Sequence, residues 1–200
     1  MNPYLYMIVG LCLIPYSFFL SAAEQPNIIY ILADDMGYGD VAANNPNCKF
    51  PTPFLDQLAE EGMRFSDAHT NSSVCTPTRY GILTGRYSWR TGLKGGVLDG
   101  AAGPLIASNR TTVATFLKKQ GYNTACVGKW HLGMSWPTKD GKKPVRSRGD
   151  NIDFTQPIEN GPNDVGFDYF YGISASLNMP PHAYIENRMI DGEDLVFAKD

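Results

Sequence analysis

Short apolar runs that alternate with capped helices restrict the folds open to this chain more than any other feature. Residues 27–33 (Asn-Ile-Ile-Tyr-Ile-Leu-Ala) are rich in β-branched side chains, which is typical of a strand buried in a parallel sheet. Residues 122–128 form another such run, and residues 64–69 form a shorter strand candidate. Because helices separate these runs, we expect right-handed strand–helix–strand units in an α/β fold, whose mixed, largely parallel sheet is sandwiched between helices.

Two helices are expected from the residues at their ends. Thr52 is a suitable N-cap, Pro53 fits the first helical position, and Gly62 follows the last periodic residue. This helix is interpreted as purely structural. A second amphipathic helix is expected within residues 111–121, where threonines begin the segment, lysines occupy the last turn and glycine follows.

The segment Cys75-Thr76-Pro77-Thr78-Arg79 places a nucleophile and a permanent cation close together. Pro77 has a fixed φ and no N–H, so it fits a turn or the start of a helix and leaves Cys75 near that start. Free N–H groups and the positive dipole end of a helix attract anions. Arg79 adds planar donors that grip two oxygens of a sulfate or phosphate. A structural cysteine beside an ordinary helix is the alternative.

Asp34 and Asp35 directly follow the first apolar run. Open α/β sheets bind ligands at the carboxyl ends of their strands, and the glycines that follow allow a bend that lets both carboxylates converge. Such hard oxygen ligands suit Ca²⁺ or Mg²⁺. The pair predicts a divalent metal site, with a solvated turn as the alternative.

Lys129 and His131 follow the second apolar run in Gly128-Lys129-Trp130-His131-Leu132-Gly133. If the strand geometry continues, side chains two residues apart point to the same side of the sheet. We then expect both to point into the crevice that holds Cys75 and the two aspartates. The alternative is a pair of ordinary surface residues.

Together these motifs resemble the type I, formylglycine-dependent sulfatases, an arylsulfatase-like family of the alkaline phosphatase superfamily. Cys-x-Pro-x-Arg is extended here by Leu83-Thr84-Gly85-Arg86, as in that family. The resemblance implies that Cys75 is oxidised to formylglycine by a formylglycine-generating or an anaerobic sulfatase-maturating enzyme. It also implies metal ligation by Asp34, Asp35 and the modified Cys75, and catalytic roles for Arg79, Lys129 and His131.

The resemblance continues beyond these motifs. Residues 166–172 (Gly-Phe-Asp-Tyr-Phe-Tyr-Gly) are similar to an element that sulfatases carry after their lysine–histidine strand. Ser176 then matches a serine that contacts sulfate in some members, and His182 and Tyr184 follow where a substrate pocket could use them. For His182 and Tyr184, incidental surface positions are an equal alternative. The polar residues 134–165 are interpreted as a functional insertion beside the substrate cleft.

The activity that this resemblance implies is hydrolysis of sulfate esters, with a sulfated carbohydrate or an aryl sulfate as substrate. Two alternatives stay open: a phosphate monoester or diester hydrolase on the same fold, and a non-catalytic carbohydrate-binding relative. A net charge of -3 with 43% hydrophobic residues gives no basic surface of the kind that binds nucleic acid, so no nucleic-acid partner is expected.

Residues 1–23 are almost entirely apolar, contain no charge and end in Ser-Ala-Ala. They are interpreted as a cleaved signal peptide, which predicts a secreted or periplasmic protein without stable membrane insertion; an uncleaved anchor is the alternative. In an exported chain Cys48 and Cys126 are able to form one disulfide, which the sequence cannot establish. By the family resemblance, residues 24–200 are the N-terminal portion of a catalytic domain, truncated before its C-terminal part and inactive alone.

Overall fold

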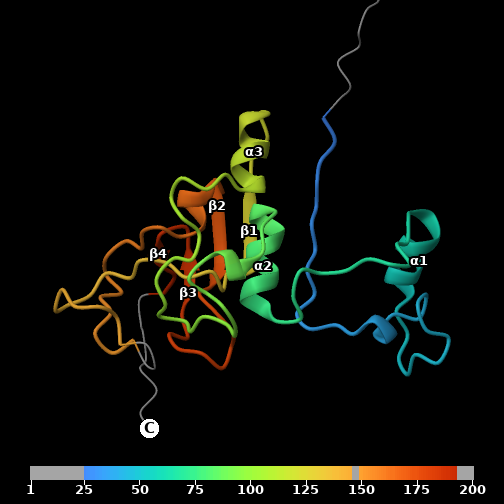
Figure 1. Ribbon diagram of the computed structural model, residues 1–200, viewed down its shortest axis with the longest axis horizontal. Coiled ribbons are helices and arrows are strands. Elements are labelled where there is room, and N and C mark those ends of the chain that lie inside the picture. Colours follow the sequence, from blue (N-terminus) through green and yellow to red (C-terminus); the bar gives the residue numbers. More distant parts are fainter. Residues whose placement is uncertain (1–24, 146–148, 193–200) are drawn as a thin grey trace, which may run out of the picture. The chain divides into compact units, whose positions relative to one another are not determined.

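The computed structural model describes residues 25–145 and 149–192 (Figure 1). The expected signal peptide lies outside these residues. The chain divides into a first unit that ends at Gly37 and a second unit that begins at Tyr38, and each is described by itself. Within the described residues, no helix combines the length and the apolar character needed to cross a bilayer.

The first unit differs from the sequence prediction. Its residues 25–33 have no regular secondary structure, and Asp34 and Asp35 form a turn. Ile29 and Ile31 are each 85% exposed, although both belong to the run predicted to be a buried strand. A strand needs neighbouring backbone for its hydrogen bonds, and no strand in the described part of the chain pairs with this segment. The predicted strand at residues 27–33 is therefore wrong for this structure.

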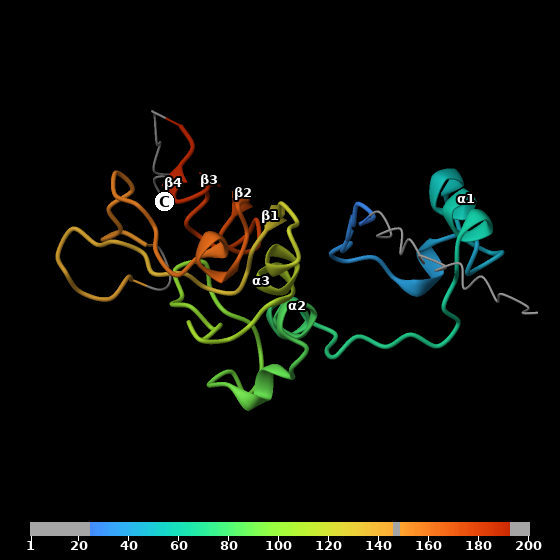
Figure 2. The same ribbon diagram turned by 90° about the horizontal axis from the view of Figure 1, so that it is seen from above.

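The second unit contains a mixed sheet in the order β1-β2-β3-β4, visible from above in Figure 2. β1 (Ala125–Lys129) runs parallel to β2 (Tyr169–Ile173), while β3 (Tyr184–Glu186) and β4 (Met189–Ile190) continue the sheet in antiparallel fashion. The strand predicted within residues 122–128 is confirmed with a small shift. The sheet also agrees with the predicted mixed α/β class.

β1 and β2 approach each other closely at a pair of glycines. Gly128 lies opposite Gly172 in the parallel register. A Cβ atom added to Gly172 would lie only 1.7 Å from the carbonyl oxygen of Gly128, so no side chain fits at Gly172. Gly128 itself has a φ of 103°, a left-handed conformation that glycine adopts without penalty.

The helices begin and end where the sequence predicts. α1 (Pro53–Glu61) begins after Thr52 and ends before Gly62, but the Thr52 hydroxyl donates to the Asp56 carboxylate and does not cap the helix. α3 (Val113–Lys119) is capped by the Thr112 side chain, which accepts from the Thr115 N–H. α2 (Cys75–Thr84) contacts α3. Three short 3-10 helices complete the described elements: η1 (Tyr38–Asp40), η2 (Ser88–Arg90) and η3 (Pro162–Val165).

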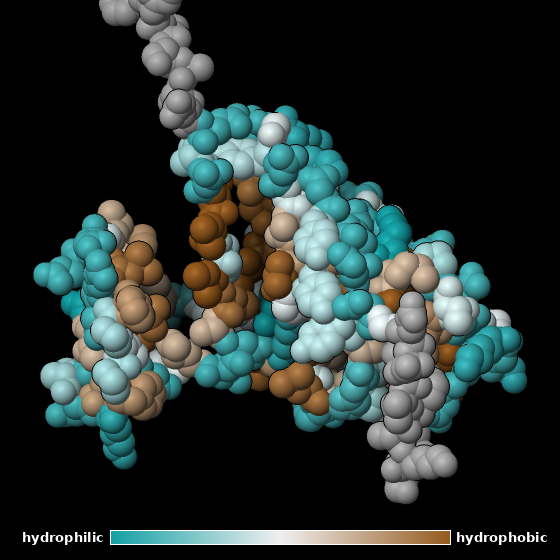
Figure 3. Space-filling model, turned by 180° about the vertical axis from the view of Figure 1, so that it is seen from behind, coloured by the Kyte–Doolittle hydropathy of each residue, from teal (hydrophilic) through white to brown (hydrophobic). Residues whose placement is uncertain are grey.

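The strand predicted at residues 64–69 is wrong for this structure. These residues contain no strand, and Phe65 is 70% exposed. The apolar side chains of α1, among them Phe54, Leu55 and Leu58, are exposed as well. Hydrophobic residues on the surface are brown in Figure 3. The same holds for residues 27–33. An apolar pattern shows which side chains suit burial, but burial also requires another element of the structure to pack against them.

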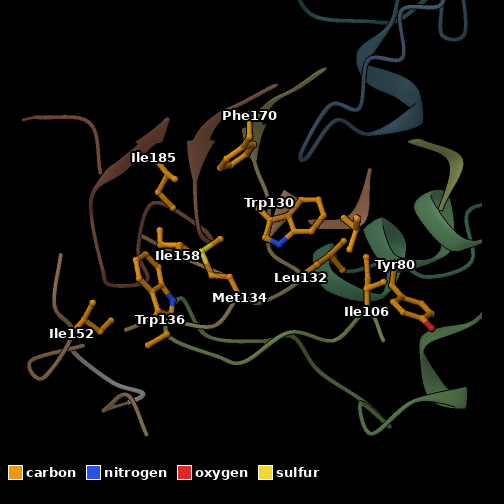
Figure 4. Close-up of a cluster of buried hydrophobic side chains, with 12 residues drawn as sticks. Tyr80, Ile106, Trp130, Leu132, Met134, Trp136, Ile152, Ile158, Phe170 and Ile185 are labelled. Atoms are coloured by element: carbon orange, nitrogen blue, oxygen red, sulfur yellow. The ribbon is translucent and has the colours of Figure 1, made fainter. Parts of the chain in front are cut away.

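The core of the second unit gathers side chains from α2, from the residues that follow β1, and from the sheet (Figure 4). Trp130 makes edge contacts with the rings of Phe167 and Phe170, and Phe170 is fully buried. Residues 134–165, which look like a polar loop in the sequence, contribute to this core through Met134, Trp136, Ile152, Ile158 and Val165. Packing therefore anchors the insertion to the sheet.

Candidate active site

Cys75 is the first residue of α2, in agreement with the sequence prediction. Val74, the N-cap, is extended with a φ of -130°, and its carbonyl accepts from the Thr78 N–H at 3.2 Å. Pro77 occupies the third helical position, where the N–H that it lacks would have no partner inside the helix. The proline thus leaves the helix start intact, and the half-buried Cys75 lies beside the N–H groups of the first turn.

Side chains from the preceding loop hold the start of α2. Asn71 donates from its amide nitrogen to the Pro77 carbonyl at 2.7 Å. The Thr78 hydroxyl donates to the Ser72 carbonyl at 2.8 Å. Because both bonds bridge six residues, they fix the path of the chain as it enters Cys75.

Arg79 connects the two motifs that carry the chemistry. It lies four residues after Cys75 on α2, so both side chains share one face of the helix. Nη1 of its guanidinium donates a hydrogen bond to the backbone carbonyl of Lys129, the last residue of β1. The structure therefore brings Cys75, Arg79 and the end of β1 into one region, although 50 residues separate Arg79 from Lys129.

The predicted side-by-side placement of Lys129 and His131 does not follow from strand geometry. β1 ends at Lys129, and His131 has a φ of 57°, in the left-handed region. Strand alternation therefore stops before His131, and the assumption behind that prediction is wrong. Backbone pairing with the β2 side continues nevertheless, since Trp130 donates to the Ile173 carbonyl and His131 to the Ser174 carbonyl, both at 2.9 Å.

His131 is fully buried, and its ring contacts the backbone of a distant segment. Nε2 lies 2.6 Å from the Leu98 carbonyl oxygen. Because a carbonyl oxygen only accepts, Nε2 is the protonated nitrogen of this bond. The Leu98 N–H in turn donates to the hydroxyl of Thr76, the buried second residue of α2, at 3.1 Å. Leu98 thus links His131 to the start of the nucleophile helix.

This Leu98 connection is absent from the sequence prediction. It uses backbone groups, which every residue type carries, so the side chain at position 98 gives no signal for it. Thr76 occupies a variable position of the Cys-x-Pro-x-Arg motif, yet its hydroxyl has a structural partner of its own.

The charge of Arg79 also reaches Cys126 on β1. Burial raises the pKa of the Cys126 thiol to about 11, and the positive charge of Arg79 opposes part of that shift. Cys126 is therefore a neutral thiol at physiological pH. Cys48, Cys75 and Cys126 are all free thiols, so the disulfide considered for Cys48 and Cys126 is not formed.

Asp34 and Asp35 belong to the first unit, where both are exposed in one turn. Their carboxylate oxygens fit the donor preference of Ca²⁺ or Mg²⁺. Among residues 25–145 and 149–192, no group of three or more histidine, cysteine, aspartate or glutamate residues is arranged to hold a metal ion. The donor chemistry of the pair fits a hard cation, and two carboxylates supply only part of a coordination shell.

Ser176 and His182, predicted to contact substrate, line the same pocket in the second unit. The pocket has a volume of about 160 Å³ and is lined by the end of β2, the start of β3 and the loop that connects them. Tyr184, at the start of β3, belongs to the same lining. The structure therefore brings together three residues that the sequence had only placed near one another in the chain.

Comparison with known proteins gives a consistent family. The sulfatase family profile matches residues 26–195. An N-acetylgalactosamine-6-O-sulfatase of Bacteroides thetaiotaomicron is 38% identical over 86% of this chain and 31% of its own length. Arylsulfatase G of Mus musculus is 41% identical over 78% of this chain and 25% of its own length.

Solved structures agree with these relatives. A structure from work on the metabolism of multiple glycosaminoglycans by Bacteroides thetaiotaomicron is 37% identical, with a TM-score of 0.74 over 86% of this chain and 33% of its own. The PsFucS1 sulfatase from Pseudoalteromonas sp. is 31% identical, with a TM-score of 0.51 over 72% of this chain and 25% of its own. The chain thus spans about a third or less of the length of these proteins.

Proposed function

This chain belongs to the sulfatase family, and we propose on that basis that it provides the nucleophile and the charged residues of a site that hydrolyses sulfate esters. The observation that carries the proposal is the hydrogen bond from Arg79 to the Lys129 carbonyl. It joins the helix that begins with Cys75 to the strand that ends in Lys129, which supports the proposal that the cysteine motif and the lysine–histidine motif form one site.

In this proposal Cys75 is converted to formylglycine, and its place at the start of α2 serves anion chemistry. Sulfate ester hydrolysis gathers negative charge on the sulfuryl oxygens as the alcohol leaves. The N–H groups of the first helical turn, the Arg79 guanidinium and the Lys129 ammonium stabilise that charge. The carbonyl of Lys129 orients Arg79, because a hydrogen bond to a fixed acceptor restricts the direction in which the planar guanidinium points.

His131 acts in this scheme as a proton acceptor. Its Nε2 donates to the Leu98 carbonyl, so in the neutral ring Nδ1 carries the lone pair and receives the proton. If one hydroxyl of the hydrated formylglycine displaced the alcohol from sulfur and so carried the sulfate, His131 would take the proton of the second hydroxyl. The C–O bond to the sulfate would then break, which would restore the aldehyde and release sulfate. The bond to Leu98 fixes both the tautomer and the ring orientation for this step.

The metal of this proposal is Ca²⁺, with Mg²⁺ as the alternative, and Asp34 and Asp35 are its ligands together with the modified Cys75. When bound, the cation lowers the pKa of a hydroxyl ligand and neutralises sulfate charge. The two aspartates act in holding it.

The proposed substrates are sulfated carbohydrates or aryl sulfates, in keeping with the names of the relatives. The proposal includes export to the periplasm or the exterior by the apolar residues 1–23, and maturation by a formylglycine-generating or anaerobic sulfatase-maturating enzyme.

The test uses full-length protein produced together with a maturation enzyme. We expect the Cys75 peptide to be lighter than its encoded mass by about 18 Da, the change from thiol to aldehyde. We also expect the protein to release sulfate from 4-nitrophenyl sulfate or from N-acetylgalactosamine 6-sulfate. The matched control is Cys75→Ala, which keeps the helix start and should abolish release. Faster hydrolysis of 4-nitrophenyl phosphate than of the sulfate would instead indicate a phosphatase.

A further inference from the structure

The pocket after β2 lies next to the proposed reaction centre. Lys129 is paired with Ile173 in the parallel register, and Ile173 is the first residue of the pocket lining. The backbone of His131 bonds to Ser174, two residues before Ser176. The pocket therefore opens at the carboxyl ends of the parallel strands, where α/β sheets bind ligands and where the alcohol part of a sulfate ester would lie.

The lining is mostly apolar with a few polar groups, the composition of a small-molecule site. Its residues are Ile173, Ala175, Ser176, Leu177, Met179, Pro181, His182, Ala183 and Tyr184. Its volume of about 160 Å³ lies below the range of about 300 to 1,000 Å³ that holds drug-sized ligands. The pocket thus has room for one ring rather than for a chain of them.

Alternating burial sets which side chains reach this pocket from the β3 side. Ala183 and Ile185 are buried, while His182 and Tyr184 are exposed. In an extended segment, residues two apart share one face. His182 and Tyr184 therefore project together, and Ser176 joins the lining from the turn closed by the bond between the Met179 N–H and the Ser176 carbonyl at 2.9 Å.

Tyr184 presents a supported aromatic ring. It stacks on Tyr171 of β2, with ring centroids 5.7 Å apart and an interplanar angle of 11°. Tyr171 is itself held by a hydrogen bond from its hydroxyl to Asp191 at 2.8 Å. Stacking covers one face of the Tyr184 ring, yet the residue remains 55% exposed, so its other face is accessible. Such a rigid ring costs little conformational entropy on binding.

We propose that Tyr184 is a specificity-determining residue that packs against the pyranose ring bearing the sulfate, while His182 bonds to a hydroxyl of that ring and Ser176 lies toward its sulfate group. The electron-rich face of an aromatic ring attracts the C–H groups along one face of a sugar, and the apolar lining suits the same surface. The imidazole of His182 suits a hydroxyl at the ring edge, because a buried hydroxyl without a partner would weaken binding. This inference rests on the proposed function, since it places the sugar beside the sulfate site.

The experiment measures kinetics of the full-length, matured protein on N-acetylgalactosamine 6-sulfate. We expect Tyr184→Ala to raise KM about tenfold with kcat changed less than about threefold, because the ring contributes to binding rather than to the chemical step. Tyr184→Phe keeps the ring and should stay near wild type. The matched control is Tyr169→Ala, an exposed tyrosine on β2 outside the pocket, which should leave KM unchanged.

A binding measurement separates this inference from the proposed function. Calorimetry of the Cys75→Ala protein with N-acetylgalactosamine 6-sulfate needs no turnover, and a Tyr184-dependent Kd would support the sugar subsite even without hydrolysis. Equal KM values for wild type and Tyr184→Ala, or a Kd unaffected by that change in a protein of normal melting temperature, would overturn it. A loss seen with 4-nitrophenyl sulfate but not with the sugar would show that the ring serves aryl groups.

Discussion

His131 and Leu98 are joined by a hydrogen bond of 2.6 Å between Nε2 of the buried ring and the backbone carbonyl oxygen. Leu98 also donates its N–H to Thr76 on α2. The imidazole is therefore tied to the nucleophile helix through a single residue of a third segment, and this residue offers only backbone groups. A histidine proposed for proton transfer thus also has a structural role.

The first prediction concerns this double role. His131→Ala should lower the free energy of unfolding by about 1–3 kcal/mol, because it leaves a carbonyl without its donor and empties a fully buried site. Urea denaturation followed by tryptophan fluorescence measures the change. His69→Ala is the matched control, since His69 is exposed and bonds only locally to Asp67. A destabilisation as large at His69 would contradict the buried-partner explanation.

Arg79 should not tolerate lysine. Arg79→Lys keeps the charge but loses the fixed fork that bonds to the Lys129 carbonyl while presenting further donors. We expect turnover to fall about a hundredfold to a thousandfold, the usual effect of removing one preorganised contact to the reacting group. Steady-state kinetics on the matured protein provide the measurement. Lys119→Ala, in the last turn of α3, should remain near wild type. Near-normal turnover of Arg79→Lys would mark the arginine as structural.

Gly172→Ala should destabilise the sheet. The added Cβ would meet the Gly128 carbonyl oxygen at 1.7 Å, so β1 and β2 would have to separate. Overpacking of this kind costs about 1–3 kcal/mol or more. Thermal unfolding compares this variant with Gly92→Ala, where nothing lies within 4 Å of the new Cβ. Equal melting temperatures for the two variants would show that β1 and β2 can move apart without a loss of stability.

Asp168 should make stability depend on acid pH. Lys118, followed by the N–H and the hydroxyl of Thr124, holds the pKa of Asp168 at about 2 in the folded protein. The unfolded chain has a value near 3.9, so the stabilisation is complete above that pH and is lost as pH falls from about 4 to about 2. The difference in melting temperature between wild type and Asp168→Asn should shrink over that range. Asp150→Asn, an exposed control, should show no such trend.

The sequence predicted the elements whose signals are local. Pro53 at one helix start and the threonines at another sufficed to place α1 and α3, because such signals act within a single turn, although the Thr52 side chain itself makes no capping bond. Cys75 was correctly placed at the start of a helix because Pro77 favours the first turn. At these helix starts, the neighbouring residues alone were enough to predict the observed structure.

The failed predictions all depend on distant partners. Residues 27–33 have the pattern of a buried strand, but a strand forms only where another edge receives its hydrogen bonds. The placement of His131 was missed because His131 itself adopts a left-handed conformation just after β1. Histidine is enriched in that region relative to most residues, but the conformation is still uncommon, and here it accompanies the bond of the ring to the distant Leu98 carbonyl. The Arg79–Lys129 and His131–Leu98 bonds likewise use backbone acceptors that no residue pattern reveals.

The parallel pairing of β1 with β2 has a kinetic consequence. Ala125 must pair with Tyr169 in register, and Arg79 must reach Lys129 across 50 residues. The entropy cost of closing these long loops is therefore incurred before the stabilising contacts form. α2 is local and can form early, whereas the acceptor that orients Arg79 exists only once β1 has found its place. During synthesis, Cys75 therefore leaves the ribosome well ahead of the strand that completes its surroundings, and remains accessible for an interval set by the rate of sheet assembly.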